Sequence, residues 1–145
     1  RYFNSFKLNM SLEKPENNTS NLEKVKSLEK YGFTVAPDMI NSQNAFRVSL
    51  KSIEENYLIT IRILFNDPSG SDVVITNMAT LPEEQKGKGY GSMAIQNLLK
   101  WAQENNFKEI RATQIQEQNK NFWTKNGFVK DSNKTLNAND FLLKL

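Results

Sequence analysis

The sequence predicts a single α/β (α+β) domain in which an antiparallel β-meander precedes an amphipathic helix. Three observations indicate this class: three strand-like runs follow one another with short links, a glycine-rich loop comes next, and a stretch with helical periodicity follows the loop. The 145 residues, 38% of them hydrophobic and 24% charged, suffice for a sizeable core. We therefore expect one domain over 1–145, with residues 1–18 as an irregular N-terminal segment.

A short helix is predicted to open the ordered part of the chain. Thr19 or Ser20 can cap its start, and Gly32 can end it because glycine tolerates positive φ. Its apolar stripe is expected to consist of Leu22, Val25 and Leu28. The segment FTVAP, which follows Gly32, is predicted to be a short strand.

Three further runs predict strands joined in series. Their side chains alternate between apolar and polar or are rich in β-branched residues, as is typical of half-buried strands. The runs are Ala45–Lys51, Tyr57–Phe65 and Asp72–Leu81. The sequence DPSG at 67–70 is a strong turn signal between the last two, and such short links favour antiparallel pairing.

The second half of the chain alternates between helices and strands. A helix is predicted from Gly91 to about Asn105, with an inward face of Ile95, Leu98, Leu99 and Ala102. It is followed by a strand over Lys108–Ile115 and a second helix over Gln116–Asn126, which Gly127 ends. The segments FVK and FLLKL (Phe141–Leu145) are predicted to be the last two strands.

The amino-acid composition excludes several kinds of catalytic and metal-binding site. The chain has no cysteine and no histidine, which rules out disulfides, a thiolate nucleophile, an imidazole base and the usual zinc sites, and we expect no metal. The net charge of +3 is mild, and Arg47, Lys51 and Arg62 fit a solvated sheet face better than a nucleic-acid surface. No apolar run is long enough for a membrane span, so we expect no membrane partner and a cytoplasmic location.

The segment KGKGYG, Lys86–Gly91, predicts an anion site. Glycine inside regular structure costs roughly 0.5–1 kcal/mol relative to alanine, so three in five positions indicate a tight bend or a close contact. The loop leads into a helix N-terminus, whose unpaired N–H groups attract anions. Lys86, Lys88 and Ser92 add charge and a hydroxyl, and a pyrophosphate is the natural guest. The spacing fits neither the nucleotide-hydrolase phosphate loop nor the dinucleotide fingerprint.

KGKGYG resembles the [QR]-x-x-G-x-[GA] pyrophosphate signature of the GCN5-related N-acetyltransferases. FWTKNGF (Phe122–Phe128) is similar to that family's F-Y-x-K-x-G-F pattern, and the order of strand, loop, helix, strand and helix agrees over about Asp72–Lys130. The resemblance implies a mixed, mostly antiparallel central sheet of about six or seven strands flanked by helices. It also implies that the two central strands, Val73–Leu81 and Lys108–Ile115, splay apart.

The resemblance further implies acetyl-CoA as cosubstrate and direct transfer of its acetyl group to a primary amine of a small molecule or protein. The pantetheine arm would lie in the splay, and a backbone N–H near Ala79 would polarise the acetyl carbonyl and stabilise the oxyanion. The pyrophosphate would rest on the amides of 87–92. The cofactor-binding residues so implied are Ala79, Thr80, Leu81, Lys86, Gly87, Lys88, Gly89, Tyr90, Gly91, Ser92, Asn119 and Trp123.

The sequence departs from the family pattern at three places. Ile75–Asn77 holds no glutamate where several members have one, so the general base is unassigned. Trp123 stands where many members have a tyrosine, so the general acid is unassigned. Lys86 replaces glutamine or arginine. These departures leave a non-catalytic acyl-CoA-binding sensor or interaction domain as the alternative function.

Several roles stay open at this level. Trp123 either packs or lines the cofactor channel, and Tyr90 either shields the phosphates or packs beneath the loop. Asn119 and Gln116 either reach pantetheine amides or are solvated, and Lys125 either lies at the surface or approaches the CoA phosphates. A homodimer that pairs through the FLLKL strand is also open, and no signature identifies the acceptor.

Overall fold

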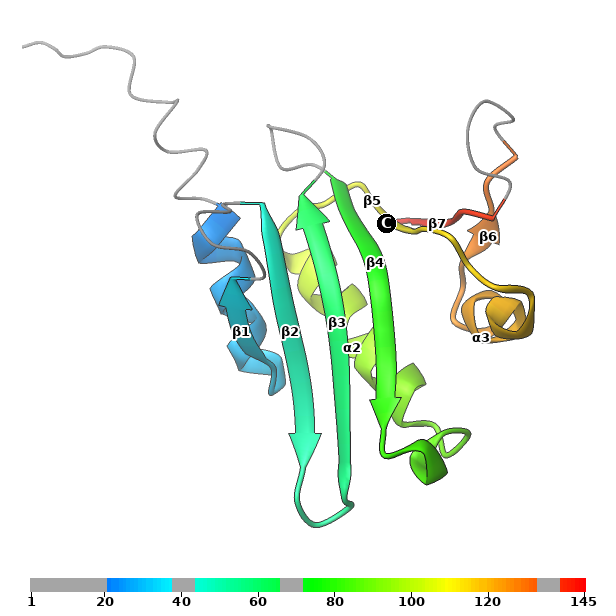
Figure 1. Ribbon diagram of the computed structural model, residues 1–145. Helices are drawn as coiled ribbons and strands as arrows, with labels where there is room; N and C mark the ends of the chain where they lie inside the picture. The colour runs from blue at the N-terminus through cyan, green and yellow to red at the C-terminus, as the bar shows by residue number, and fades with distance from the viewer. Residues whose placement is uncertain (1–20, 38–43, 66–71, 133–138) are drawn as a thin grey trace, which may run out of the picture.

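A computed structural model describes residues 21–37, 44–65, 72–132 and 139–145. Seven strands form one sheet in the order β1-β2-β3-β4-β5-β7-β6, which confirms the predicted mixed, mostly antiparallel sheet (Figure 1). The pair β4–β5 is parallel and the others are antiparallel. The strands are β1 (Thr34–Pro37), β2 (Ala45–Ser52), β3 (Tyr57–Phe65), β4 (Asp72–Leu81), β5 (Glu109–Ala112), β6 (Val129–Lys130) and β7 (Phe141–Lys144).

The first half of the chain follows the prediction closely. Strands β2, β3 and β4 form the expected meander, and the bounds of β3 and β4 agree with the predicted runs. The N-terminal helix covers 21–26 and tightens into the 3₁₀ helix η1 (Ser27–Tyr31), which ends at Gly32 with φ of 89°. The proposed caps at 19 and 20 lie outside the described residues.

The predicted apolar stripe of this helix is wrong at Leu22. Val25 and Leu28 are buried, but the Leu22 residue is 44% exposed. The face that packs on the core passes through Asn21, Val25 and Leu28, at the i, i+4, i+7 spacing of a helix face. Leu22 lies one residue further around the helix and therefore points towards solvent.

Helix α2 (Tyr90–Glu104) supplies the largest helical contribution to the core. All four residues of the predicted inward face are buried, and Ala94 and Trp101 are buried beside them. The Trp101 indole Nε1 donates to the Lys24 carbonyl oxygen at 2.7 Å and to Ser27 Oγ at 3.0 Å. These bonds satisfy the buried N–H and join α2 to the N-terminal helix.

The second half of the sheet is shorter than predicted. Strand β5 ends at Ala112 rather than Ile115, and the second helix divides into η3 (Glu117–Asn119) and α3 (Lys120–Lys125). Strand β7 lies between β5 and β6, pairing with both through Phe141 and Leu142. The FLLKL segment is therefore an interior strand at Phe141 and Leu142, with β6 on the side away from β5.

Candidate functional site

Strands β4 and β5 pair over four residues only and then separate. Asp72–Ile75 pairs with Glu109–Ala112, and the Thr113 N–H donates to the Ile75 carbonyl oxygen at 3.0 Å. Beyond this bond β4 continues to Leu81 without β5 beside it. This separation is the splay that the family resemblance implies.

Gln114 turns the chain away from β4. Its φ of +57° lies in the left-handed region, which is uncommon for a residue other than glycine. The Gln114 N–H donates to Asp140 Oδ1 at 3.1 Å, and the Ile115 N–H donates to the Asn139 carbonyl oxygen at 2.9 Å. The segment after β5 is thus hydrogen-bonded to the two residues that precede β7 instead of to β4.

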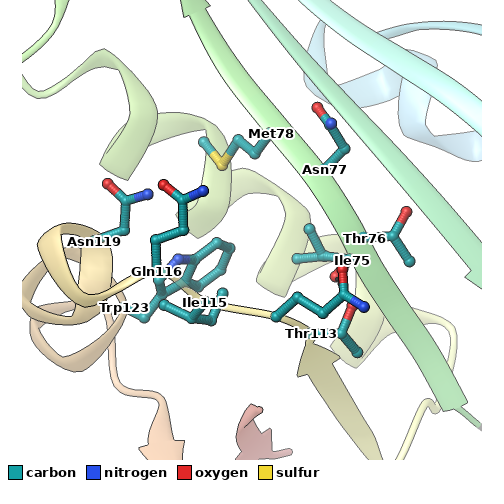
Figure 2. A pocket seen from close by; sticks show the side chains of 10 residues that line it. Ile75, Thr76, Asn77, Met78, Thr113, Ile115, Gln116, Asn119 and Trp123 are labelled. Carbon is teal, nitrogen blue, oxygen red and sulfur yellow. Dashed lines mark hydrogen bonds between the residues drawn. The ribbon is translucent and has the colours of Figure 1, made fainter. Parts of the chain in front are cut away.

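Two cavities occupy the splay. The smaller, of about 330 Å³, lies between the middle of β4 and the segment after β5. Figure 2 shows its walls, with Gln116 and Asn119 extending from the start of η3 and α3 into the gap opposite Met78. The larger, of about 430 Å³, lies between the end of β4, the glycine loop and α3. Both are lined by Met78, Asn119 and Trp123, so they adjoin one another.

The three glycines of the loop serve two purposes. Gly87 and Gly89 have φ of 82° and 92°, and no described atom beyond the adjacent residues lies within 4 Å of the place where a Cβ would stand. They are needed for the bend. A Cβ on Gly91 would lie 3.2 Å from Phe122 Cε1 and 3.4 Å from Met78 Cε. Gly91 is therefore needed for the close approach of α2 to α3 and β4.

The bend delivers the N-terminus of α2 to the larger cavity. Its N-cap is Gly89, which has no side chain to bond the first N–H groups of the helix. Gly89, Gly91 and Ser92 line the cavity, and so do Lys86 and Lys125. Lys86 Nζ lies 3.1 Å from Glu83 Oε2, and both side chains are largely exposed. Helix N-terminal amides without side-chain partners, beside two cationic side chains, give this end of the cavity the electrostatics that attract an anion.

The structure brings most of the sequence-predicted site residues together. Those that line one or both cavities are Ala79, Thr80, Lys86, Gly87, Gly89, Gly91, Ser92, Asn119 and Trp123. Leu81, Lys88 and Tyr90 are not among the lining residues. Gln116 and Lys125, whose roles the sequence left open, do contribute to the walls.

Tyr90 packs against the β2–β3 turn and not over the cavity. Its ring stacks on Tyr57 with centroids 4.1 Å apart, and its hydroxyl donates to Glu55 Oε1 at 2.9 Å. The hydrogen bond to this carboxylate raises the pKa of the Tyr90 phenol above its usual value. Of the two roles that the sequence allowed, the structure supports packing.

Trp123 packs in the core and also lines both cavities. The residue is 5% exposed and makes edge-to-face contacts with Phe122 and Phe128, with ring centroids 5.2 and 5.0 Å away. It also lines both cavities. A large, fixed aromatic ring therefore forms the wall between the two cavities and the core.

Asn126 is a structural residue of the site that the sequence did not reveal. Its buried side-chain amide donates from Nδ2 to Ser92 Oγ at 3.0 Å and to the Phe122 carbonyl oxygen at 2.8 Å, and its Oδ1 accepts from Gln96 Nε2 at 3.1 Å. The Ser92 hydroxyl keeps its own hydrogen for another acceptor. In sequence, an asparagine before Gly127 is indistinguishable from an ordinary helix end.

The described walls of the smaller cavity carry no ionisable side chain. Its lining combines apolar groups with uncharged hydrogen-bonding groups: Ile75, Thr76, Asn77, Met78, Thr113, Gln114, Ile115, Gln116, Asn119 and Trp123. Arg62 touches this wall from outside, donating from Nη1 to Thr76 Oγ1 at 2.9 Å. In the described parts of the chain, no group of three or more acidic residues is placed to hold a metal, and no helix is long and apolar enough to cross a membrane.

Comparisons with known proteins agree with this geometry. A model of the acetyltransferase (GNAT) family matches residues 22–128. Tetrahymena GCN5 has 11% identity and a TM-score of 0.57 over 92% of this chain and 89% of that chain. The PaiA N-acetyltransferase of Thermoplasma acidophilum, solved in complex with coenzyme A, has 16% identity and a TM-score of 0.53 over 94% and 80%. A chimera of the Vibrio cholerae spermidine N-acetyltransferase SpeG with hSSAT has 17% identity and a TM-score of 0.53 over 92% and 84%. At these identities the structural likeness shows the fold alone, and comparison with curated protein sequences gives no match.

Proposed function

Because the chain belongs to the GNAT family of acetyltransferases, we propose that it transfers the acetyl group of acetyl-CoA directly to a primary amine of a small molecule or protein. One observation carries this proposal: two adjoining cavities run from the fork between β4 and β5 to the N-terminus of α2. A long thioester with an anionic end matches that shape. The anionic end would lie at the loop and the thioester at the fork.

The loop residues would hold the diphosphate. Residues 87–92 lead through two bends with positive φ, at Gly87 and Gly89, into the first turn of α2, where their N–H groups would bind the phosphates. Lys86 and Lys125 on the cavity wall and Lys88 on the loop add positive charge, and the Ser92 hydroxyl can donate to a phosphate oxygen. Each of these groups is a hydrogen-bond donor or a cation, which suits the anionic oxygens of the CoA diphosphate.

The register of β4 supports a specific choice of oxyanion donor. The Ile75 backbone bonds to Thr113, so the residues that share its face point their N–H groups towards the splay. The β3–β4 register shifts by one residue after Ile75, so Met78 and Thr80 lie on the same face as Ile75. They pair with Ile61 and Ile59, which are core residues on that face. We therefore assign polarisation of the acetyl carbonyl to the amides of Met78 and Thr80, which flank Ala79, with the Ala79 amide directed towards β3.

In the proposed reaction the nitrogen of a neutral amine attacks the thioester carbon. The carbon–nitrogen bond forms as the carbonyl oxygen takes up negative charge, which the β4 amides stabilise. The carbon–sulfur bond then breaks and CoA leaves as the thiolate. The ammonium proton of the intermediate passes to solvent, and solvent protonates the thiolate, so atoms and charge balance without an acid or base from the described walls.

Binding and turnover test the proposal separately. Calorimetry with CoA and acetyl-CoA should show binding, and a thiol-release assay with a panel of primary amines should show acetyl-CoA consumption above the rate without amine. Absence of CoA binding would overturn the assignment of both cavities.

The second candidate is a non-catalytic acyl-CoA-binding module. Trp123 favours it, because an indole fills the place of the family's tyrosine and its N–H is not a practical acid. Binding of acetyl-CoA with no transfer to any amine, together with a partner whose affinity depends on acetyl-CoA, would select this function over the first.

A further inference from the structure

The glycine loop is held at both ends by one turn. The four residues 86–89 lie between Gln85 and Tyr90, and both of these side chains bond to the turn that joins β2 to β3. We name the set Glu55, Asn56, Tyr57, Gln85 and Tyr90 the loop brace. The loop and the turn are about thirty residues apart in sequence, so the contact exists only in the folded chain.

The Gln85 end of the brace is buried. The residue is 7% exposed, and its Nε2 donates to the carbonyl oxygens of Glu55 and Asn56, both at 2.7 Å. The turn that accepts these bonds is itself ordered: the Glu55 N–H donates to Ser52 Oγ at 3.0 Å, and Asn56 has a positive φ of 58°. Two short bonds to neighbouring carbonyl oxygens fix both the position and the orientation of the Gln85 amide.

The Tyr90 end anchors the first residue of α2. The Tyr57 stack and the bond to Glu55 Oε1 hold the phenol ring, and its Cα is the point where the loop becomes helix. The N–H of this residue is among those that the N-cap leaves without a side-chain partner. Holding the ring therefore also fixes the direction in which the first N–H groups of α2 point.

The brace compensates for the flexibility that the glycines introduce. Gly87 and Gly89 give the loop its bend, but glycine loses the most conformational freedom when a chain becomes ordered. Without the brace, ligand binding would have to order the loop, and that entropy cost would lower the affinity. We propose that Gln85, Tyr90 and Glu55 are positioning residues that pre-organise the loop amides for the diphosphate of the cosubstrate. This inference rests on the proposed function, which places the diphosphate at the loop.

The test compares a donor that has the diphosphate with one that lacks it. Tyr90→Phe keeps the stack and loses the bond to Glu55, and Glu55→Ala loses the same bond from the other side. Glu54→Ala, an exposed neighbour in the same turn, is the matched control. We expect the Kd for CoA and the KM for acetyl-CoA to rise about three- to tenfold in both brace variants, the range given by one lost hydrogen bond. The kcat should stay within about twofold, and the entropy of CoA binding should become less favourable.

The donor S-acetylpantetheine has no diphosphate, so its kcat/KM in the thiol-release assay should be the same in wild type, Tyr90→Phe and Glu55→Ala. An unchanged Kd for CoA in both brace variants would overturn the inference and leave the proposed function intact. An equal loss for both donors would also overturn it, because that pattern indicates general damage and not diphosphate positioning. If wild type itself fails to bind CoA, the proposed function fails first.

Discussion

Replacing Gly89 with alanine tests two effects separately: the loss of folding stability from backbone strain, and the loss of CoA affinity. Gly89 has φ of 92° and ψ of −1°, a conformation that an L side chain adopts with a strain of about 2 kcal/mol. Alanine also makes the unfolded chain less flexible, which stabilises the folded state by about 0.7 kcal/mol. No described atom beyond the adjacent residues lies within 4 Å of the new Cβ, so no clash with other parts of the chain adds to this balance. The net loss of about 1.3 kcal/mol should lower Tm by roughly 4 °C in a domain of this size.

The effect of Gly89→Ala on CoA binding should be much larger than its effect on stability. The methyl group would stand on the wall of the larger cavity, beside the N–H groups assigned to the diphosphate. Calorimetry should show the Kd for CoA rising at least about tenfold, while thermal unfolding shows a folded protein with a modestly lower Tm.

Gly32→Ala is the matched control for this experiment. Gly32 has φ of 89° and ψ of 1°, almost the same backbone as Gly89, but it ends η1 and lines neither cavity. Its Cβ would lie 3.2 Å from Leu50 Cδ1, so its Tm should fall at least as far, with no change in CoA affinity. Wild-type CoA affinity in Gly89→Ala would refute the diphosphate assignment, and a raised Tm would refute the strain argument.

Three further predictions concern the fork and its supports. Gln114→Gly should raise Tm by roughly 2 °C, because it removes the strain of a φ of +57° at a smaller cost in unfolded-state entropy; a lower Tm would contradict this. Asn126→Ala should lower the free energy of unfolding by about 2 kcal/mol, because three hydrogen bonds lose one partner. Asn121→Ala, at an exposed residue, should change this free energy little, and equal values for the two variants in urea denaturation would contradict the prediction. Because the described wall of the smaller cavity has no ionisable group, the pH profile of kcat/KM should follow the pKa of the acceptor amine. The value of kcat/KM should stop rising near about pH 8 for an α-amine and near about pH 10 for a lysine ε-amine. One inflection near about pH 6–7 that both acceptors share would contradict this.

The elements that the sequence predicted best are those whose partners are close in sequence. The meander strands alternate cleanly because consecutive strands pair, so local pattern and tertiary environment agree. The sequence predicts a longer β5 than the structure has, because Thr113–Ile115 continues the alternation. The backbone N–H groups of Gln114 and Ile115 instead donate to Asp140 and Asn139 in another part of the chain. Local periodicity carries no information on that competition.

The same distinction separates the predicted from the unpredicted parts of the site. The three glycines of the loop and Lys86 belong to one contiguous motif, so their position at one cavity could be predicted. Tyr90 could not be assigned, because its partner Glu55 lies 35 residues earlier in the chain. Asn126 was missed for a related reason: the bonds that give it a role reach Ser92 and Gln96 on another helix.

The choice of oxyanion donor depends on a single extra residue in β4. Counting every second residue from Ile75 would direct Asn77, Ala79 and Leu81 towards the splay. The β3–β4 register shifts between Arg62 and Ile63, so that Ile75 pairs with Ile63 and Asn77 with Arg62, and Thr76 is the bulged residue. The bulge reverses the alternation: Met78 takes the core face, and Asn77 and Ala79 take the other. One inserted residue thereby places the Met78 thioether at the junction of the two cavities and the Asn77 amide on the wall of the smaller one. The stretch Ile75–Asn77, which holds no glutamate, therefore gives this wall no carboxylate.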